Sequence, residues 1–437
     1  MRNGIIVTMN DGYDVVPGDV SIRDGRIAAV GNVSAEHHDR VIDARGGYIL
    51  PGFVQTHVHL CQTLFRGRAD DLPLMDWLRT RVWLMEAAHT PASLRTTTRL
   101  ATAELLASGT TSVLTMETVH DTDVVFEAAA ESGIRATIGK CMMDAASAEV
   151  PRRLQETARA AIDESQALRD RWDGSGGGRI RAAFAPRFAV SCSRQLLEAV
   201  AALSAETRTI VHTHASESRD EIAIVREISG GLSNVEYLAS VRLTSPRLNV
   251  AHCVWVDDRE QGLLAESEVK VTHCPSSNLK LGSGLAPVVE LRQKGVNVSL
   301  GADGAACNNR LDMFEEMRLA ALLQATRRAP GALIARDALT MATRCGAKAL
   351  GLEAEVGSLE IGKRADVIVV DATRPHLLAA GDPYSALVYS ARGSDVRTTV
   401  VDGETLVDDF CLKRVDLQEL RVETEAQAMA LAARAGL

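Results

Sequence analysis

Residues 52–60 read GFVQTHVHL, an apolar strand that ends in the pair His57 and His59. Alternation along a strand puts both imidazoles on one face, where two ligands of one metal ion would have to lie. A neutral imidazole suits zinc or iron. An HxH pair alone is weak evidence, because roughly half or more of such pairs are simply polar residues on a strand. Whether this pair marks a metal site therefore depends on where it lies in the fold.

Downstream of this stretch, apolar runs alternate with segments in which apolar residues recur every three or four positions. Parallel strands need such long crossovers, so the alternation predicts a parallel sheet. Counting the strand that ends at His59, eight strand–helix units fit into about three hundred residues, as in a (β/α)8 barrel of the TIM type. The other strands are predicted at 111–116, 136–139, 180–185, 209–214, 248–252, 269–273 and 296–301, with helices among them at 94–108, 123–132, 195–205 and 261–267.

Both ends of the chain are rich in β signals, including a hairpin turn at Asp24-Gly25. The sequence therefore predicts an α/β protein in which residues 1–51 form the N-terminal part of a small β-sandwich and residues 52–353 form the barrel. Residues 354–437 are expected to complete the sandwich and to end in a helix at 417–433. The DGSGGG stretch at 173–178 is predicted to be a surface loop.

The chain has 437 residues, with 48 Lys+Arg against 57 Asp+Glu and a formal net charge of −9. Nucleic-acid binding needs clustered basic charge, so this balance argues against it. The sequence contains neither an apolar run of about 18 residues nor a long apolar signal core, so no membrane partner is expected. Eight Cys without CxxC pairs are typical of reduced thiols. We expect a cytoplasmic protein with a small-molecule partner.

Polar residues follow three more of the predicted strands. His214 and Glu217 follow the fifth, His252 the sixth and Asp303 the eighth. Barrel enzymes place their sites at this end of the strands. Burying imidazoles and carboxylates there without partners would cost several kcal/mol, so convergence on one metal is the simplest explanation.

The predicted ligands of one divalent metal ion, Zn²⁺ or alternatively Fe²⁺, are His57, His59, His214 and Asp303. Such an ion lowers the pKa of bound water from about 15.7 towards 7. Glu217 is expected to take the water proton, His252 to orient the hydroxide, and Asp303 to accept a proton as well as bind the metal. His212 lies on the same strand face as His214, but only His214 has a carboxylate three residues on.

These segments resemble the amidohydrolase superfamily over nearly the whole chain. IDARGGYILPGFVQTHVHL is similar to its entry into the barrel, HASES to its fifth-strand segment, AHC to its sixth and LGADGAACNN to its eighth. THCPSSNLKLGSGLAP together with LGADGAACNNRLDMFEEMRLAALLQ resembles the mononuclear branch that acts on purines, nucleosides and triazines. The binuclear members use a carboxylated Lys on the fourth strand, and IRAAFAPRF has none, which favours one metal.

The resemblance also bears on the substrate. RGRADDLPLMDWLRTRVWLMEAAHT is similar to deaminases of S-adenosylhomocysteine, methylthioadenosine and 5′-deoxyadenosine, which implies that Glu86 holds ribose hydroxyls. Gln62 and Arg187 resemble residues with which guanine deaminases grip the purine, and many adenosine-type relatives have His in place of Arg187. If Arg187 packs on an acid such as Asp144, it is structural. Trp83 is expected to line the pocket mouth or to pack a helix.

The resulting prediction is a metal-dependent aminohydrolase of cyclic amidines that releases ammonia from an adenine nucleoside through a metal-bound hydroxide. The alternatives are a guanine or oxopurine deaminase, or a triazine amino- or chlorohydrolase. An inactive barrel used as a binding scaffold is the alternative of another class, and it would have no reason to keep Glu217 with the ligand set. The relatives imply a homo-oligomer, while His120 and His273 are left open between support of the site and a structural role.

Overall fold

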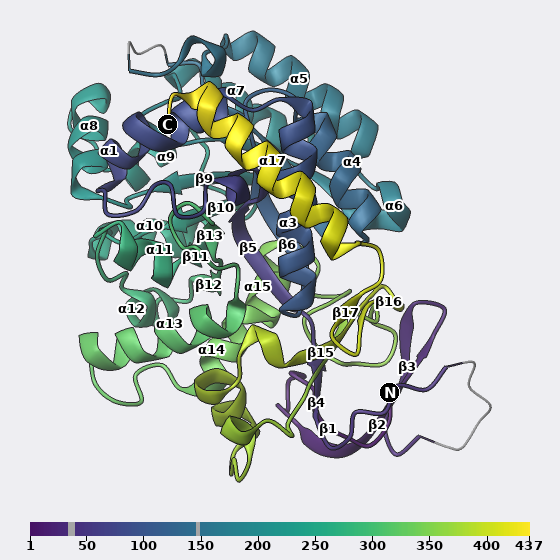
Figure 1. The fold of residues 1–437 in the computed structure, drawn as a ribbon. Coiled ribbons are helices and arrows are strands. Elements are labelled where there is room, and N and C mark those ends of the chain that lie inside the picture. The colour runs from purple at the N-terminus through teal and green to yellow at the C-terminus, as the bar shows by residue number, and fades with distance from the viewer. Residues whose placement is uncertain (34–39, 146–148) are drawn as a thin grey trace.

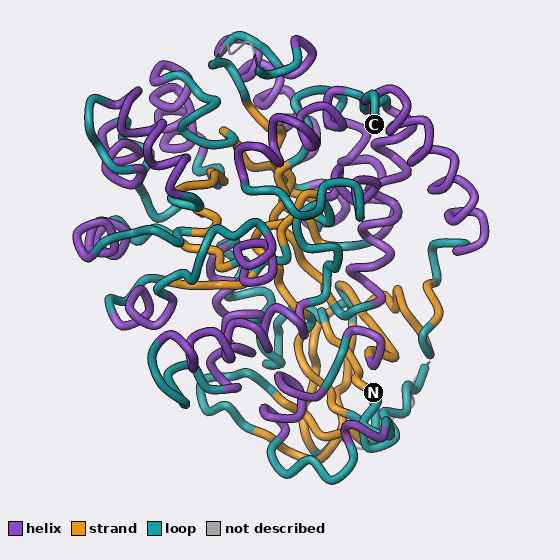
Figure 2. The backbone as a smooth tube through the Cα atoms, turned by 60° about the vertical axis from the view of Figure 1, so that its left-hand side comes forward, coloured by secondary structure: helices purple, strands orange, loops and turns teal. Residues whose placement is uncertain are grey.

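The structure is a computed structural model that describes residues 1–33, 40–145 and 149–437. A parallel sheet curls around the centre of the molecule with helices outside it, and a second, mixed sheet built from both ends of the chain lies beside it (Figure 1). The tube view shows the central strands inside a layer of helices (Figure 2). The strands of the central sheet are β5 (Phe53–His59), β6 (Thr110–Met116), β7 (Arg135–Met142), β8 (Ile180–Pro186), β9 (Val211–Ala215), β10 (Leu248–His252), β11 (Lys270–His273), β12 (Asn297–Leu300) and β13 (Asp303–Gly304).

The central sheet closes into a barrel through its last two strands. Neighbouring strands pair in parallel from β5 to β12, and β13, which begins three residues after β12 ends, pairs in parallel with β5. β12 and β13 together therefore act as the eighth strand. Inside, the hydroxyl of Thr56 lies 2.8 Å from that of Thr272 and 2.7 Å from that of Ser299, which ties the first strand to the seventh and eighth. The predicted (β/α)8 barrel is confirmed.

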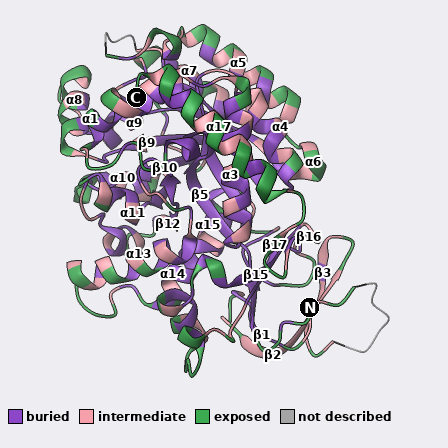
Figure 3. Ribbon diagram, viewed as in Figure 1, coloured by how far each residue is buried: buried purple, intermediate pink, exposed green. Residues whose placement is uncertain are grey.

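Helices cover the outside of the barrel, and the strands inside are almost wholly buried (Figure 3). The longest of the early helices begins at a capping box on Thr90 with Pro91 in its first turn. The outer helices are α3 (Pro91–Ala107), α4 (Thr122–Ser132), α5 (Ala158–Trp172), α7 (Arg194–Thr207), α8 (Arg219–Ser229), α9 (Asn234–Ser240), α10 (Asp258–Glu266), α11 (Pro275–Lys280), α12 (Val288–Gln293), α13 (Met313–Arg327), α14 (Ala335–Ala342) and α15 (Arg344–Ala349).

The second sheet joins both ends of the chain. Its strand order is β17-β16-β15-β14-β4-β1-β2-β3. Its own apolar core contains Ile6, Val20, Ile27, Ile49 and Val367, so strands from both termini share one cluster, as the predicted sandwich requires. The strands are β1 (Gly4–Val7), β2 (Val15–Arg23), β3 (Arg26–Gly31), β4 (Tyr48–Pro51), β14 (Val367–Val370), β15 (Val396–Val401), β16 (Glu404–Asp408) and β17 (Cys411–Leu412).

Two further segments lie outside the two sheets. The terminal helix α17 (Leu417–Ala435) lies across α3 (Figure 1). The predicted loop at 173–178 contains a short helical turn, α6 (Ser175–Gly178), whose central glycines have left-handed backbone angles. Within the described ranges, no helix has the length and apolar character needed to span a membrane.

One segment between β5 and α3 leaves the regular barrel pattern. It consists of η1 (Leu60–Phe65), α1 (Leu74–Trp77), the single π-helical turn η2 (Leu78–Val82) and α2 (Trp83–Ala87). π turns of this kind are frequent at functional sites. Because η1 starts directly after His59, the segment begins at the carboxyl end of the barrel strands.

Candidate active site

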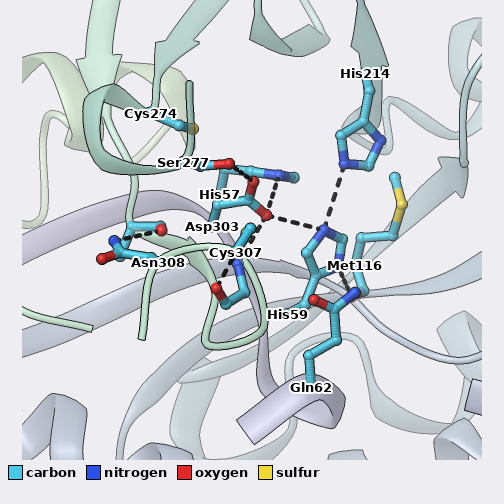
Figure 4. A network of polar contacts seen from close by, with 12 residues as sticks. His57, His59, Gln62, Met116, His214, Cys274, Ser277, Asp303, Cys307 and Asn308 are labelled. Carbon is cyan, nitrogen blue, oxygen red and sulfur yellow. Dashed lines mark hydrogen bonds and ion pairs between the residues drawn. The ribbon is translucent and has the colours of Figure 1, made fainter. Parts of the chain in front are cut away.

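Five polar side chains meet at the carboxyl ends of the barrel strands. His57 and His59 come from β5, His214 from β9, His252 from β10 and Asp303 from β13. The candidate ligand atoms of these residues form two groups that share His57, and within each group the atoms lie within 4.8 Å of one another. One group is His57, His59 and His214, and the other is His57, His252 and Asp303. Figure 4 shows His57, His59, His214 and Asp303 pointing toward a common centre.

The hydrogen bonds of two histidines leave their lone pairs facing this centre. Nδ1 of His59 lies 2.6 Å from the carbonyl oxygen of Met116, and Nδ1 of His214 lies 2.7 Å from that of Arg187. A carbonyl only accepts, so each Nδ1 donates a proton and each Nε2 keeps its lone pair. The two Nε2 atoms are 3.3 Å apart, and the buried Nε2 of His57 has no hydrogen-bond partner. Two lone pairs and an unpartnered Nε2 turned toward one buried point fit a cation.

Asp303 adds a negative charge at the same point. Its Oδ1 lies 3.2 Å from Nε2 of His57 and 3.3 Å from Nε2 of His59, while its Oδ2 accepts a hydrogen bond from Ser277 at 2.7 Å. Burial by itself would raise the pKa of Asp303, but the neighbouring histidines outweigh burial and hold that pKa well below its usual value. Asp303 has φ +62°, a left-handed conformation that is costly for an aspartate and typical of functional positions.

Burial keeps the histidines of the centre neutral. It lowers the pKa of His59 to about 3 and that of His214 well below its ordinary value. Neutral imidazole is the form that binds a metal.

His212 lies behind the centre. Its Nε2 is 2.7 Å from Nδ1 of His57, so it orients the ring of His57. Of the two histidines of β9, His214 is therefore the one that faces the candidate ligands. The fourth barrel strand, β8, carries no lysine, and the buried Lys140 of β7 is paired with Glu156 at 2.8 Å.

Glu217 and His252 form a second pair beside the candidate metal centre. Nε2 of His252 lies 3.4 Å from Oε2 of Glu217 and 3.8 Å from Oδ2 of Asp303. Burial raises the pKa of Glu217 to about 7. Burial would lower the pKa of His252, but the charges of Glu217 and Asp303 outweigh it and raise that pKa. A carboxyl group that titrates near neutral pH suits the transfer of a proton in both directions.

A small cavity opens beside these groups, and its free space of about 30 Å³ is below the usual range of small-molecule sites. Polar groups line one part of it, and apolar side chains line the rest. Its lining residues are His59, Leu74, Trp77, Leu78, Arg187, Phe188, His214, Glu217, His252, Leu281 and Asp303.

Two of the residues predicted to bind substrate lie behind Arg187. The guanidinium of Arg187 donates to both oxygens of Glu86, at 2.6 and 3.3 Å, and Gln62 donates to Glu86 at 3.0 Å. Arg187 therefore packs on an acid, but the acid is Glu86 and not Asp144, and Arg187 still faces the cavity. The expected contact between Glu86 and ribose hydroxyls stays a prediction, since Glu86 is not among the residues that line the cavity.

Other expected residues fall into different places. Trp83 is buried in an apolar cluster, and the tryptophan that lines the cavity is Trp77. His89, in the segment that follows α2, is held by the carbonyl of Cys61 and the hydroxyl of Ser93, and it was not among the predicted site residues. His273 is buried without a hydrogen-bond partner on either ring nitrogen.

Sequence reasoning did not single out the serines that support the carboxylates. Ser277 donates to Asp303, and Ser283 donates to Glu217 at 3.2 Å. Both belong to the stretch THCPSSNLKLGSGLAP, whose small polar residues and glycines were the available signal.

Comparison with known proteins adds independent findings. A family model described as the amidohydrolase family matches residues 48–406. The 5′-deoxyadenosine deaminase of Methanosarcina acetivorans is 40% identical over 437 residues, which is 100% of this chain and 98% of the relative. An adenosine deaminase from Xanthomonas campestris, solved with bound zinc, is similar with a TM-score of 0.90 and 32% identity, covering 98% of this chain and 97% of that one. The E. coli guanine deaminase has a TM-score of 0.84 and 29% identity, covering 93% of this chain and 98% of its own.

Proposed function

Because the chain belongs to the amidohydrolase family, we propose that it is a metal-dependent deaminase that releases ammonia from an adenine nucleoside of the 5′-deoxyadenosine class. The single observation that carries this proposal is the convergence of three histidines and Asp303 on one buried point, with Glu217 beside it and a partly apolar cavity next to both. The name of the archaeal relative, at 40% identity over the full length, supports the choice of base and sugar.

We assign one divalent ion, zinc, to His57, His59, His214 and Asp303. The free Nε2 lone pairs of the histidines and the carboxylate of Asp303 make a donor set that suits zinc. The similar adenosine deaminase from Xanthomonas carries zinc. When bound, such an ion supplies a Lewis acid that makes water acidic enough to attack at neutral pH.

Glu217 moves the proton. As a carboxylate it takes a proton from the attacking water, and as a carboxylic acid it gives this proton to the ring nitrogen next to the amine-bearing carbon. The amino group needs a second proton, which comes from the new hydroxyl on the same carbon. As this hydroxyl becomes a carbonyl, its proton passes through Asp303 to the amino group, the carbon–nitrogen bond breaks and ammonia leaves. His252, with Nε2 close to both Glu217 and Asp303, orients the water between them.

The cavity wall favours an apolar 5′ substituent. Among the described residues that line the cavity, Arg187 is the only Lys or Arg. Its charge is already paired with Glu86. Away from the metal centre the lining consists of Leu74, Trp77, Leu78, Phe188 and Leu281. A 5′-deoxy or methylthio group matches this wall, whereas the carboxylate and ammonium of a homocysteine tail would find no free partner there.

The test is ammonia release by the zinc-loaded protein on a panel of substrates. We expect 5′-deoxyadenosine and methylthioadenosine to be turned over with the highest kcat/KM, adenosine less well and S-adenosylhomocysteine poorly. Glu86→Ala is expected to weaken turnover of nucleosides, through Arg187 if not through the ribose. Turnover of guanine with none of any nucleoside would overturn the substrate assignment.

One observation favours guanine or another oxopurine as the second candidate. Arg187 is among the residues that line the cavity, and guanidinium N–H donors suit the carbonyl oxygen or ring nitrogen of an oxopurine. The similarity to the E. coli guanine deaminase supports this alternative at lower identity. The same substrate panel separates the two candidates.

A further inference from the structure

The loop that follows α11, residues 281–284, reaches Glu217 from the side opposite His252. The hydroxyl of Ser283 donates a hydrogen bond to Oε1 of Glu217 at 3.2 Å, and both side chains are buried. The other carboxylate oxygen, Oε2, lies 3.4 Å from Nε2 of His252. Each carboxylate oxygen of Glu217 therefore has a different neighbour. The oxygen near His252, Oε2, is on the side of the candidate metal centre.

Two contacts fix the position of Ser283. The indole N–H of Trp255 donates to the carbonyl oxygen of Ser283 at 2.7 Å, and the amide of Ser283 donates to the carbonyl oxygen of Asn278 at 2.8 Å. Gly284 has φ +125°, and a Cβ there would lie 2.9 Å from the Trp255 ring. Only glycine allows the loop to approach the indole this closely.

The same stretch of chain also supports His252. Oδ1 of Asn278 accepts a hydrogen bond from Nδ1 of His252 at 2.9 Å, which leaves Nε2 of that ring to face Glu217. Asn278 thus holds the histidine with its side chain and Ser283 with its backbone. Both proton-handling groups of the site are oriented by residues 278–284.

We propose that Ser283 is a positioning residue for the deamination: its hydroxyl holds one oxygen of Glu217 so that the other oxygen carries the proton. Trp255 acts one step further out by holding Ser283 in place. The inference rests on the proposed function only in requiring that ammonia release proceeds through Glu217. It does not depend on which aminopurine is the substrate.

The experiment compares three variants of the zinc-loaded protein on its best substrate. Ser283→Ala is expected to lower kcat by roughly 10- to 100-fold, the range for a hydrogen bond to a charged group, with KM and zinc content unchanged. Ser283→Thr keeps a hydroxyl and is expected to restore most of kcat. Trp255→Phe keeps an aromatic ring but removes the N–H donor, and it is expected to lower kcat to an intermediate level.

A pH profile distinguishes positioning from a merely structural effect. The groups that face Glu217 are His252, Asp303, Glu221 and Ser283. The hydroxyl of Ser283 favours the charged form of Glu217, and Ser283→Ala removes this hydroxyl alone. The pKa of Glu217 should therefore rise, and the acidic limb of kcat/KM is expected to move to higher pH. Trp255 is 37% exposed, so Trp255→Phe tests the proposal even if Ser283→Ala fails to fold.

Failure of the role of Ser283 can be told apart from failure of the proposed function. An unchanged kcat and an unmoved acidic limb in Ser283→Ala, or in Trp255→Phe should Ser283→Ala not fold, would overturn the role of Ser283 while ammonia release by the unmodified protein still stood. A fall in activity that Ser283→Thr does not restore would also overturn it. If the unmodified zinc-loaded protein deaminates no aminopurine, or if Glu217→Gln stays fully active, the proposed function fails first and the role of Ser283 with it.

Discussion

The backbone carbonyl of Arg187 accepts the Nδ1 proton of His214 at 2.7 Å, while the guanidinium of Arg187 donates to both oxygens of Glu86. Residue 187 therefore has two separate functions, one for each part of it. Its backbone fixes the ring that faces the candidate metal centre, and we propose that its guanidinium recognises the substrate. A substitution that keeps the backbone in place should change substrate recognition and leave metal binding intact.

The pair formed by Arg187 and Glu86 gives the first prediction. Both side chains are buried, so Glu86→Gln leaves an uncompensated charge and is expected to destabilise the protein by about 3–5 kcal/mol. Replacing both partners, with Arg187→Met in addition to Glu86→Gln, is expected to recover most of that loss. Urea unfolding of the two variants checks this. A cost below about 1 kcal/mol for Glu86→Gln, as for exposed pairs, would contradict a buried ion pair.

His212 gives the second prediction, which concerns metal affinity. Because it orients His57 through a hydrogen bond, His212→Leu is expected to weaken zinc binding by about 10- to 100-fold. Competition with a chromogenic chelator measures the affinity without any reference to activity. His89→Leu is the matched control: that histidine is equally buried but has no contact with the candidate ligands. Equal losses in the two variants would show only a general effect on stability.

The architecture of the chain could be predicted from periodicity, because barrel strands and helices repeat in a regular order. The rim of the barrel is less regular. Ser216, His252 and Asp303 all have positive φ, so the side chains at these strand ends do not follow simple alternation. The sequence could predict that the polar side chains at the strand ends lie close together. It could not predict which atoms pair with one another, because the pairing depends on these local turns.

The substrate side of the site was harder to predict. Trp77 and Trp83 lie on either side of the π turn η2, whose wider turn shifts the following side chains around the helix axis, and the sequence carries no clear signal for such a turn. Glu86 and Arg187 could each be recognised from a family resemblance. Their mutual pairing joins residues 101 positions apart in the chain and follows only from the closed barrel.

The two tryptophans give the third prediction. Trp77 lines the cavity, so Trp77→Ala is expected to raise KM for nucleosides by about tenfold or more, as the loss of an aromatic wall should. Trp83→Ala is expected to leave KM unchanged and to lower stability by about 3–5 kcal/mol, because Trp83 packs in the apolar cluster. Trp77 belongs to the same apolar cluster, so steady-state kinetics of both variants, and not thermal unfolding, distinguish the two roles. A raised KM in Trp83→Ala together with an unchanged KM in Trp77→Ala would show that Trp83, and not Trp77, contacts the substrate.

The fourth prediction concerns pH and Glu217. Burial raises the pKa of its carboxyl group to about 7, and the group must be ionised to take a proton from water. We therefore expect kcat/KM to fall about tenfold per pH unit below pH 7 and to level off above it. The profile needs to be measured with saturating zinc, since loss of metal at low pH would produce a similar slope.

Glu217→Gln separates these two causes. The amide cannot accept the proton, so kcat is expected to fall by about 10²- to 10⁴-fold at every pH, while zinc content stays that of the unmodified protein. Stability should change in the opposite direction. A carboxyl whose folded-state pKa is raised stabilises the fold at low pH, and this contribution is lost as pH rises through about 7. At pH 8 the metal-free Glu217→Gln variant should thus unfold at a higher temperature than the unmodified metal-free protein, and a lower temperature would mean that the Glu217 carboxylate is stabilised in its buried place.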